Sequence, residues 1–198
     1  IGLIVTSITD EGYLTFANVG GVDERTLPST EVTVHGKEDL WGVIGIKPNY
    51  LLEQGKTAKL KELAVDTGLS AEKVKELVAV GDSITLAQSV GRLGKKQFSG
   101  KSLDDRASVA AIMRVMKNIK DLDIDIDVYA VAAVQEEVGC RGGKTTAYGI
   151  NPDMAVAIDV CHGITPDNSD NAFEVGTGTV LSVGPNLHPK LTDELFAV

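Results

Sequence analysis

The feature that most constrains the fold is a continuous apolar run that ends in two adjacent carboxylates. Residues 128–139 read VYAVAAVQEEVG, so the run leads almost directly to Glu136 and Glu137. An apolar run without polar alternation predicts a strand covered on both faces, as in a parallel α/β sheet. Ligands bind at the carboxyl ends of the strands in such sheets. We therefore predict that Glu136 and Glu137 belong to a catalytic site.

Composition limits the class of protein and its partners. A chain of 198 residues that is 43% hydrophobic predicts a globular protein of one or two domains. The net charge of -9 argues against nucleic acid or an anionic membrane surface as a partner and favours a cation. Neither a membrane span nor a secretory signal is evident, so a cytoplasmic location is expected. Because Ile1 enters directly into a strand pattern, we expect the chain to begin inside a larger protein.

The first part of the chain is predicted to be a small, mostly β domain. Short apolar segments alternate with turn signals from residue 1 to about 86, which is typical of a compact barrel or sandwich. One short helix is expected at 70–78, with Ser70 as its N-cap. We interpret Trp41 as a core aromatic and His35 as an exposed polar residue. The boundary is placed so that this domain covers 1–88.

Residues 88–100, QSVGRLGKKQFSG, form the predicted connector between domains. Their basic side chains are compatible with binding an acidic group, but a solvated linker is the favoured interpretation. The cysteines, Cys140 and Cys161, each follow a predicted strand end. A single disulfide between them is the less favoured alternative to two thiols.

The second part, 89–198, is predicted to be α/β. Apolar residues at helical spacing predict an amphipathic helix over 105–120, and a shorter helix is expected at 144–148, ended by Gly149. A second buried strand is predicted at 154–160, with Asp159 at its end, and another near 180–183. Strands alternating with helices at this spacing predict a parallel sheet. The fold class is therefore α/β with a parallel-type sheet, plus the small β domain.

Three acidic positions are predicted to converge on one edge of this sheet. Asp104, Glu137 and Asp159 each lie at the end of a strand or the start of a helix. Taken alone, Asp104 and Asp105 are also typical of a helix N-cap followed by a first-turn acid. Unpaired carboxylates in one cleft repel, and a divalent cation resolves the conflict; oxygen ligands suit Mg, Mn and Zn. Glu136 can then take a proton from a metal-activated water, which indicates metal-assisted hydrolysis.

Several ordered motifs resemble one family of enzymes. LDDR at 103–106, VQEEVGCRGG at 134–143, AIDVCHG at 157–163 and GPNLHPKL at 184–191 are similar to motifs of the tetrahedral aminopeptidases. These are co-catalytic metallopeptidases, also known as glutamyl aminopeptidases and sometimes labelled endoglucanases. Residues 1–27 and GVIGIKP at 42–48 resemble the β domain inserted in that family. The resemblance implies the parallel-type sheet of a dinuclear-metal exopeptidase.

The resemblance also implies a role for each acidic residue. Asp104 would bridge two divalent metal ions, most readily zinc or cobalt, with a cis peptide bond between Asp104 and Asp105. Glu137 would bind one metal ion and Asp159 the other. Glu136 would be the general base, and Asp105 would orient a neighbouring ligand.

The implied partners are short peptides and further copies of the chain. The family commonly forms dimers through its β domain and dodecamers that enclose the active sites. Its pattern includes a histidine ligand upstream of the IGLIV strand and another near the C-terminus, and this sequence holds neither segment. We therefore expect an incomplete catalytic domain, with substitute ligation by His162 or His188 as the less favoured alternative.

Two other functions stay open on the sequence. One is a non-catalytic fragment or assembly module, which the missing ligands support. The other, less favoured, is a glycoside hydrolase, because Glu136 and Glu137 are adjacent and would point to opposite faces of a strand.

Overall fold

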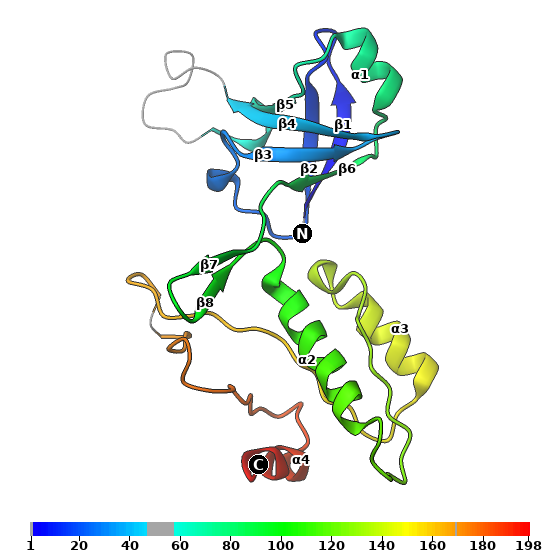
Figure 1. Cartoon of the computed structure of the whole chain (residues 1–198), viewed down its shortest axis with the longest axis vertical. Coiled ribbons are helices and arrows are strands. Elements are labelled where there is room, and N and C mark those ends of the chain that lie inside the picture. The colour runs from blue at the N-terminus through cyan, green and yellow to red at the C-terminus, as the bar shows by residue number, and fades with distance from the viewer. Residues whose placement is uncertain (1, 47–57, 169) are drawn as a thin grey trace. The chain divides into compact units, whose positions relative to one another are not determined.

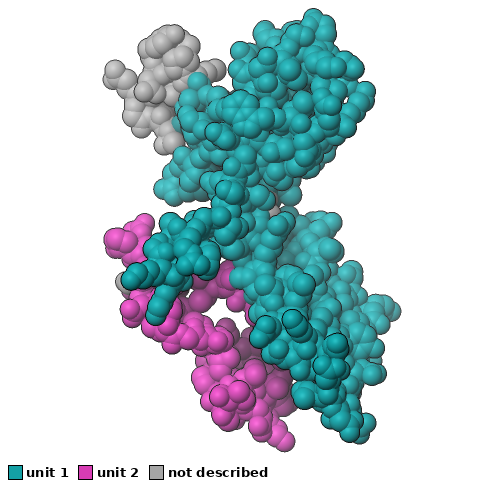
Figure 2. Space-filling model, viewed as in Figure 1, with its two compact units in different colours: residues 1–155 teal, residues 156–198 magenta. Residues whose placement is uncertain are grey.

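The computed structural model describes residues 2–46, 58–168 and 170–198. The chain divides into two compact units, Ile1–Ala155 and Val156–Val198, which Figure 2 shows in different colours. Among the described helices, none combines the length and apolar character needed to cross a membrane.

A closed antiparallel barrel forms the first part of the chain (Figure 1), which confirms the predicted small β domain. Its six strands pair in the order β1-β2-β5-β4-β3-β6. Closure removes the exposed sheet edges that would otherwise invite pairing with other chains. The strands are β1 (Gly2–Ile8), β2 (Leu14–Val19), β3 (Glu31–His35), β4 (Asp39–Ile46), β5 (Leu63–Asp66) and β6 (Ser83–Leu86).

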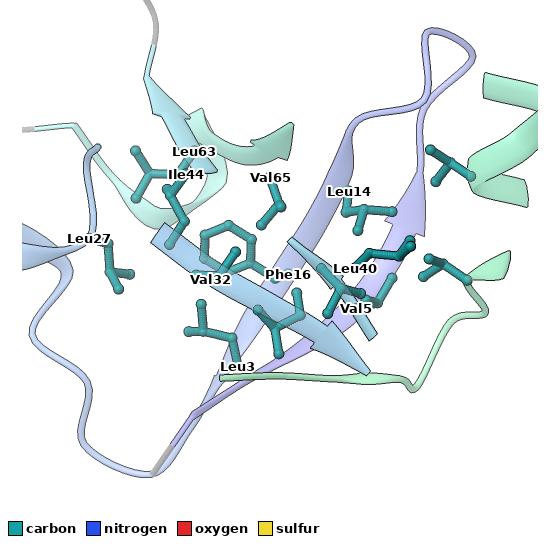
Figure 3. Packing of buried hydrophobic residues seen from close by; sticks show 14 of the residues in the cluster. Leu3, Val5, Leu14, Phe16, Leu27, Val32, Leu40, Ile44, Leu63 and Val65 are labelled. Atoms are coloured by element: carbon teal, nitrogen blue, oxygen red, sulfur yellow. The ribbon is translucent and has the colours of Figure 1, made fainter. Parts of the chain in front are cut away.

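The barrel is filled by apolar side chains that alternate along its strands (Figure 3). Leu3 and Val5 of β1 point inward, and Val32 of β3 does the same from another strand. Val34 of β3 is fully buried as well. This period of two is the pattern of a strand with one buried face. Helix α1 (Ala71–Leu77) adds two further side chains to the same core and begins at Ser70 as predicted. The barrel thus holds the main hydrophobic core of the described residues.

The interpretation of Trp41 as a core aromatic is wrong. Its side chain is 60% exposed, whereas Leu40 and Ile44 of the same strand are buried. The alternation of β4 explains the outcome, because Trp41 and the inward-pointing Leu40 are consecutive residues and face opposite sides of the strand. The position of Trp41 in the alternation of β4, and not its apolar character, decides its exposure.

His35 is half-buried and connects neighbouring strands of the barrel. Its Nδ1 lies 2.7 Å from Asp39 Oδ1 across the β3–β4 hairpin, and its Nε2 lies 2.9 Å from Thr85 Oγ1 of β6. Both ring nitrogens therefore have partners, and His35 is not the freely exposed polar residue that was expected. This network links β3 to its neighbours β4 and β6 by polar side-chain contacts.

The predicted linker contains regular structure. Residues 91–99 form an antiparallel hairpin of β7 (Gly91–Leu93) and β8 (Gln97–Ser99), in which Arg92 pairs with Phe98. The strand residues of this hairpin are exposed, as expected of a solvated linker, but their regular pairing was not expected. The sequence holds the usual hairpin signal, because two short runs flank a turn that contains Gly94.

The helices of the second part follow the sequence closely in place and less closely in extent. Helix α2 (Leu103–Ile119) confirms the helix expected over 105–120. Helix α3 (Arg141–Ile150) is longer than predicted, since Gly149 lies inside it and Asn151, with φ of 50°, ends it. Asparagine tolerates this left-handed conformation and so ends helices as glycine does. Helix α4 (Pro189–Phe196) begins at Pro189.

The structure gives no strand to the predicted segments 128–134, 154–160 and 180–183. Apolar side chains in them are exposed, including Tyr129 at 63%, Val134 at 70% and Val156 at 59%. A strand requires a neighbour whose N–H and C=O groups complete the ladder, and within the described residues these segments have none. The three strand predictions are therefore wrong for this structure, and the parallel sheet is not formed.

Candidate active site

The start of α2 carries the first pair of predicted site residues, Asp104 and Asp105. The peptide bond between them is cis, as the resemblance implied. Both residues have non-helical backbone angles, so the regular helix begins after them. Asp105 is half-buried, and its Oδ1 accepts a hydrogen bond from the N–H of Ser108 at 3.0 Å. Asp105 therefore fills an N-terminal capping role, and the exposed Asp104 lies one residue before it.

The second pair, Glu136 and Glu137, lies in a single 3-10 turn, η4 (Glu136–Val138). Three residues around this turn have left-handed backbones: Gln135 at φ 54°, Gly139 at 115° and Cys140 at 54°. Only the glycine adopts such angles without steric cost. Non-glycine residues held in this region cost about 1–3 kcal/mol each and gather at functional sites. The local backbone therefore supports a functional reading of the two glutamates.

Contacts to the following helix fix this turn. The N–H of Gly142 donates to the carbonyl of Val134 at 2.8 Å. A Cβ at position 142 would lie 2.3 Å from that oxygen, so only glycine fits there. The Nη1 of Arg141 also donates to Gln135 Oε1 at 3.3 Å. The sequence analysis missed Gly142, although the GG pair at 142–143 was a visible signal.

Cys140 adds a contact that the sequence reasoning did not anticipate. Its thiol donates a hydrogen bond to Glu136 Oε1, with 3.2 Å between the sulfur and the oxygen. The two residues are four apart, the spacing at which side chains meet across one helical turn. This thiol therefore contacts the carboxylate that was predicted to be the general base. Cys140 and Cys161 both have exposed side chains.

Asp159 belongs to the second unit, in the extended segment after Met154. Its side chain is exposed, and its Oδ1 accepts a hydrogen bond from the N–H of Val160 at 2.7 Å. The structure thus places Asp104 and Asp105 at the start of α2 and Glu136 and Glu137 in the turn η4. The convergence of these acids with Asp159 into one metal centre stays a prediction.

The chemistry of these donors fits a divalent metal ion. Asp104, Glu137 and Asp159 are exposed carboxylates and offer oxygen ligands to a hard or borderline cation. His162 and His188 were the alternative ligands. The Nδ1 of His188 accepts a hydrogen bond from the N–H of Leu191 at 3.4 Å and caps α4, which is a structural role. Only the other nitrogen of His188 would be open to a metal ion.

Comparison with known proteins defines the class as aminopeptidases. A lysyl aminopeptidase of Pyrococcus furiosus is 33% identical over 199 residues, covering 96% of this chain and 57% of the relative. The solved structure of an aminopeptidase from Desulfurococcus kamchatkensis matches with a TM-score of 0.83 at 39% identity, covering 89% of this chain and 50% of that one.

A further solved structure is the TET1 peptidase of Pyrococcus horikoshii, which can assemble into a tetrahedron or a large octahedral shell. It matches with a TM-score of 0.77 at 36% identity, covering 85% of this chain and 52% of that one. The model of the M42 glutamyl aminopeptidase family matches residues 1–198, and the chain belongs to this family. The chain spans about half the length of these relatives.

Proposed function

We propose that the protein containing this chain is a metal-dependent aminopeptidase that removes N-terminal residues from short peptides. The observation that carries the proposal is the turn at 136–138, where strained neighbours hold two adjacent glutamates in a chain matched over its whole length by a peptidase family. M42 enzymes are metallopeptidases, and the acids of this chain offer the oxygen ligands that such enzymes require.

In this proposal each acid has a separate task. Asp104 would help to hold two divalent metal ions, zinc or cobalt, and Glu137 and Asp159 would each hold one of them. Asp105 orients Asp104 through its place at the start of α2. The ions, when bound, supply Lewis acidity that polarises the scissile carbonyl and lowers the pKa of water. Glu136 takes a proton from the attacking water at a carboxylate oxygen and passes it to the leaving amine.

The same proposal assigns residues 1–88 to assembly and substrate access and residues 89–198 to part of the catalytic domain. Apolar segments 128–134 and 154–160 would become strands of a parallel sheet once further strands pair with them. Their exposed valines support this, because such a run is expected to be covered on both faces. Dimers through the barrel, larger closed assemblies and a cytoplasmic location belong to the proposal as well.

Two substitutions in the complete protein test the roles. Glu136→Gln is expected to leave metal bound and to lower turnover of an aminoacyl anilide by about 100-fold or more, because general base catalysis contributes that much. Asp104→Ala is expected to lose metal, as measured by elemental mass spectrometry after dialysis against zinc or cobalt. Glu174→Gln is the control for loss of an exposed glutamate, since Glu174 is exposed and precedes Val-Gly as Glu137 does.

Retained turnover in Glu136→Gln would remove the base assignment. Chelation separates the proposal from the glycosidase alternative, because a hydrolase that uses carboxylates alone keeps its activity when metal is removed. A protein that binds no metal yet forms a defined oligomer through the barrel would instead be an assembly module.

A further inference from the structure

The strands of the barrel carry their acidic residues on three neighbouring strands only. The six strands contain no Lys or Arg, and their acidic residues are Glu31, Asp39 and Asp66, all exposed. These belong to β3, β4 and β5, which are adjacent in the barrel. A surface that serves only solubility carries charges of both signs interspersed. The segregation of acids on these strands therefore indicates a binding role.

The strand register gathers the three acids around the side chain of Trp41. Asp39 and Trp41 are two residues apart on β4 and therefore share a face. Glu31 of β3 and Asp66 of β5 are both paired with Val43. Because Val43 is two residues beyond Trp41, these two acids are diagonal neighbours of the tryptophan, at about 7–8 Å. Acids from three strands thus lie around one aromatic side chain.

The indole of Trp41 is accessible to a ligand. It is 60% exposed, although burial of an aromatic ring contributes strongly to stability. Its paired neighbour on β3 is the small Thr33, and β5 ends at Asp66 without a residue paired to Trp41. An exposed indole attracts a cation to its ring face, and nearby carboxylates add to that attraction. We call Glu31, Asp39, Trp41 and Asp66 the Trp41 face.

Local contacts orient two of the three carboxylates. Asp39 Oδ1 lies 2.7 Å from His35 Nδ1, and Asp66 Oδ1 accepts a hydrogen bond from the N–H of Gly68 at 2.8 Å. A carboxylate offers two oxygens with about four lone-pair sites, so each group can accept further hydrogen bonds. Acceptors that are already oriented lose less conformational entropy when a ligand binds. The Trp41 face therefore combines an aromatic surface with partly preorganised acceptors.

We propose that the Trp41 face binds an arginine side chain of a basic polypeptide, with the guanidinium stacked on the indole and hydrogen-bonded to the carboxylates around it. Arginine fits better than lysine, because its planar group stacks on aromatic rings and donates to carboxylates in a fixed fork. The same face of a second copy is not the expected occupant, since it would place acids against acids. The face lies wholly within the barrel and is independent of the proposed peptidase activity.

The test titrates the 198-residue chain with three acetylated and amidated pentapeptides, which carry arginine, citrulline or lysine between glycines. Acetylation removes the free amino group that an aminopeptidase requires, and citrulline keeps the shape of arginine without its charge. The NMR signal of the indole N–H reports binding, because Trp41 is the single tryptophan.

Half-saturation with the arginine peptide is expected on the order of 1 mM, since a cation over an exposed ring and exposed charge pairs each contribute modestly. The lysine peptide should bind about threefold more weakly, because its ammonium group does not stack. The citrulline peptide should give no saturable shift. Added salt should weaken binding of both charged peptides.

Two variants locate the binding site, with far-UV circular dichroism as the check that each folds. Glu31→Gln/Asp66→Asn keeps the indole and removes two of the charges, so half-saturation should rise at least about fivefold. Trp41→Ala should abolish saturable binding of the arginine peptide. In that variant binding is followed at the amide signal of Thr33, the residue paired with position 41.

The matched control is Asp193→Asn/Glu194→Gln, which removes one exposed aspartate and one exposed glutamate from α4 and should leave binding unchanged. Equal binding of the arginine and citrulline peptides, or unchanged binding in a folded variant of the Trp41 face, would overturn the inference. An indole signal that moves when the chain is diluted without peptide would identify a second copy as the occupant and would also reject the basic partner.

Discussion

The barrel and the segments after it contain similar apolar residues, but only the barrel buries them. In the barrel, Leu3, Val32 and Ile84 are essentially inaccessible to solvent. In the later segments, Val134 and Met154 are each 70% exposed. The barrel closes on itself, so each strand finds two neighbours within residues 2–86. Hydrophobic sequence therefore produces a core only where the chain also supplies the partners.

The largest expected difference between the two regions is in hydrogen exchange. The N–H of Ile44 donates to the carbonyl of Thr30 at 2.9 Å inside the barrel. Amides such as this should exchange at least about 1,000-fold more slowly than those of residues 128–134, which join no strand ladder. Exchange followed by mass spectrometry on the 198-residue chain measures this. Equal protection in both regions would break the comparison and indicate that 128–134 pairs in solution.

A matched pair of isoleucines tests the same comparison through stability. Ile44→Ala should lower the free energy of unfolding of the barrel by about 2–5 kcal/mol, because Ile44 is fully buried and its loss leaves a cavity. Ile126→Ala should change it by less than about 0.5 kcal/mol, since Ile126 is 67% exposed.

The chain has a single tryptophan, Trp41 in β4, so its fluorescence in a denaturant titration reports on the barrel alone. A similar loss of stability in the Ile126 variant would show that the later segments pack on a core in solution.

A smaller effect is expected at the turn that holds Glu136, which is ordered locally although the sheet around it is not formed. Cys140→Ala removes the thiol that donates to Glu136 Oε1. Loss of one hydrogen bond to a carboxylate, about 1 kcal/mol here, should lower kcat of the complete protein about fivefold with KM unchanged. Cys140→Ser should retain most of the rate because its hydroxyl can donate in the same way.

Cys161→Ala is the control for general effects of removing a thiol, since Cys161 is also exposed. Equal rates for the alanine and serine variants at position 140 would show that the thiol does not position Glu136.

The smallest effect concerns an exposed ion pair beside the barrel strands. Hydrogen bonds from the Arg25 side chain and backbone N–H lower the pKa of Asp23 from 3.8 to about 2. Because the folded pKa is the lower one, this contribution to stability is present above pH 3.8 and is lost as the pH falls through about 2.

An NMR titration of the Asp23 carboxyl carbon in wild type and Arg25→Gln measures the effect. The pKa of Asp23 should move toward 3.8 in the variant. An unchanged midpoint would mean that the pair, joined at 2.7 Å between Arg25 Nη2 and Asp23 Oδ2, does not persist in solution.

The sequence by itself determined the local features of this protein. Alternation fixed the barrel strands, Ser70 marked the start of a helix, and the ordered acidic motifs pointed to the family that the comparisons then showed. Local signals suffice there because capping, alternation and motif spacing depend on neighbouring residues.

Only the tertiary structure decided burial and pairing. It turned Trp41 outward, brought the Cys140 thiol to Glu136 and left 128–134 without a strand partner among the described residues. The physical reason is that an apolar run predicts only that its side chains are buried against other parts of the protein. What covers it depends on strands far away in the sequence, and their presence cannot be read from the run itself.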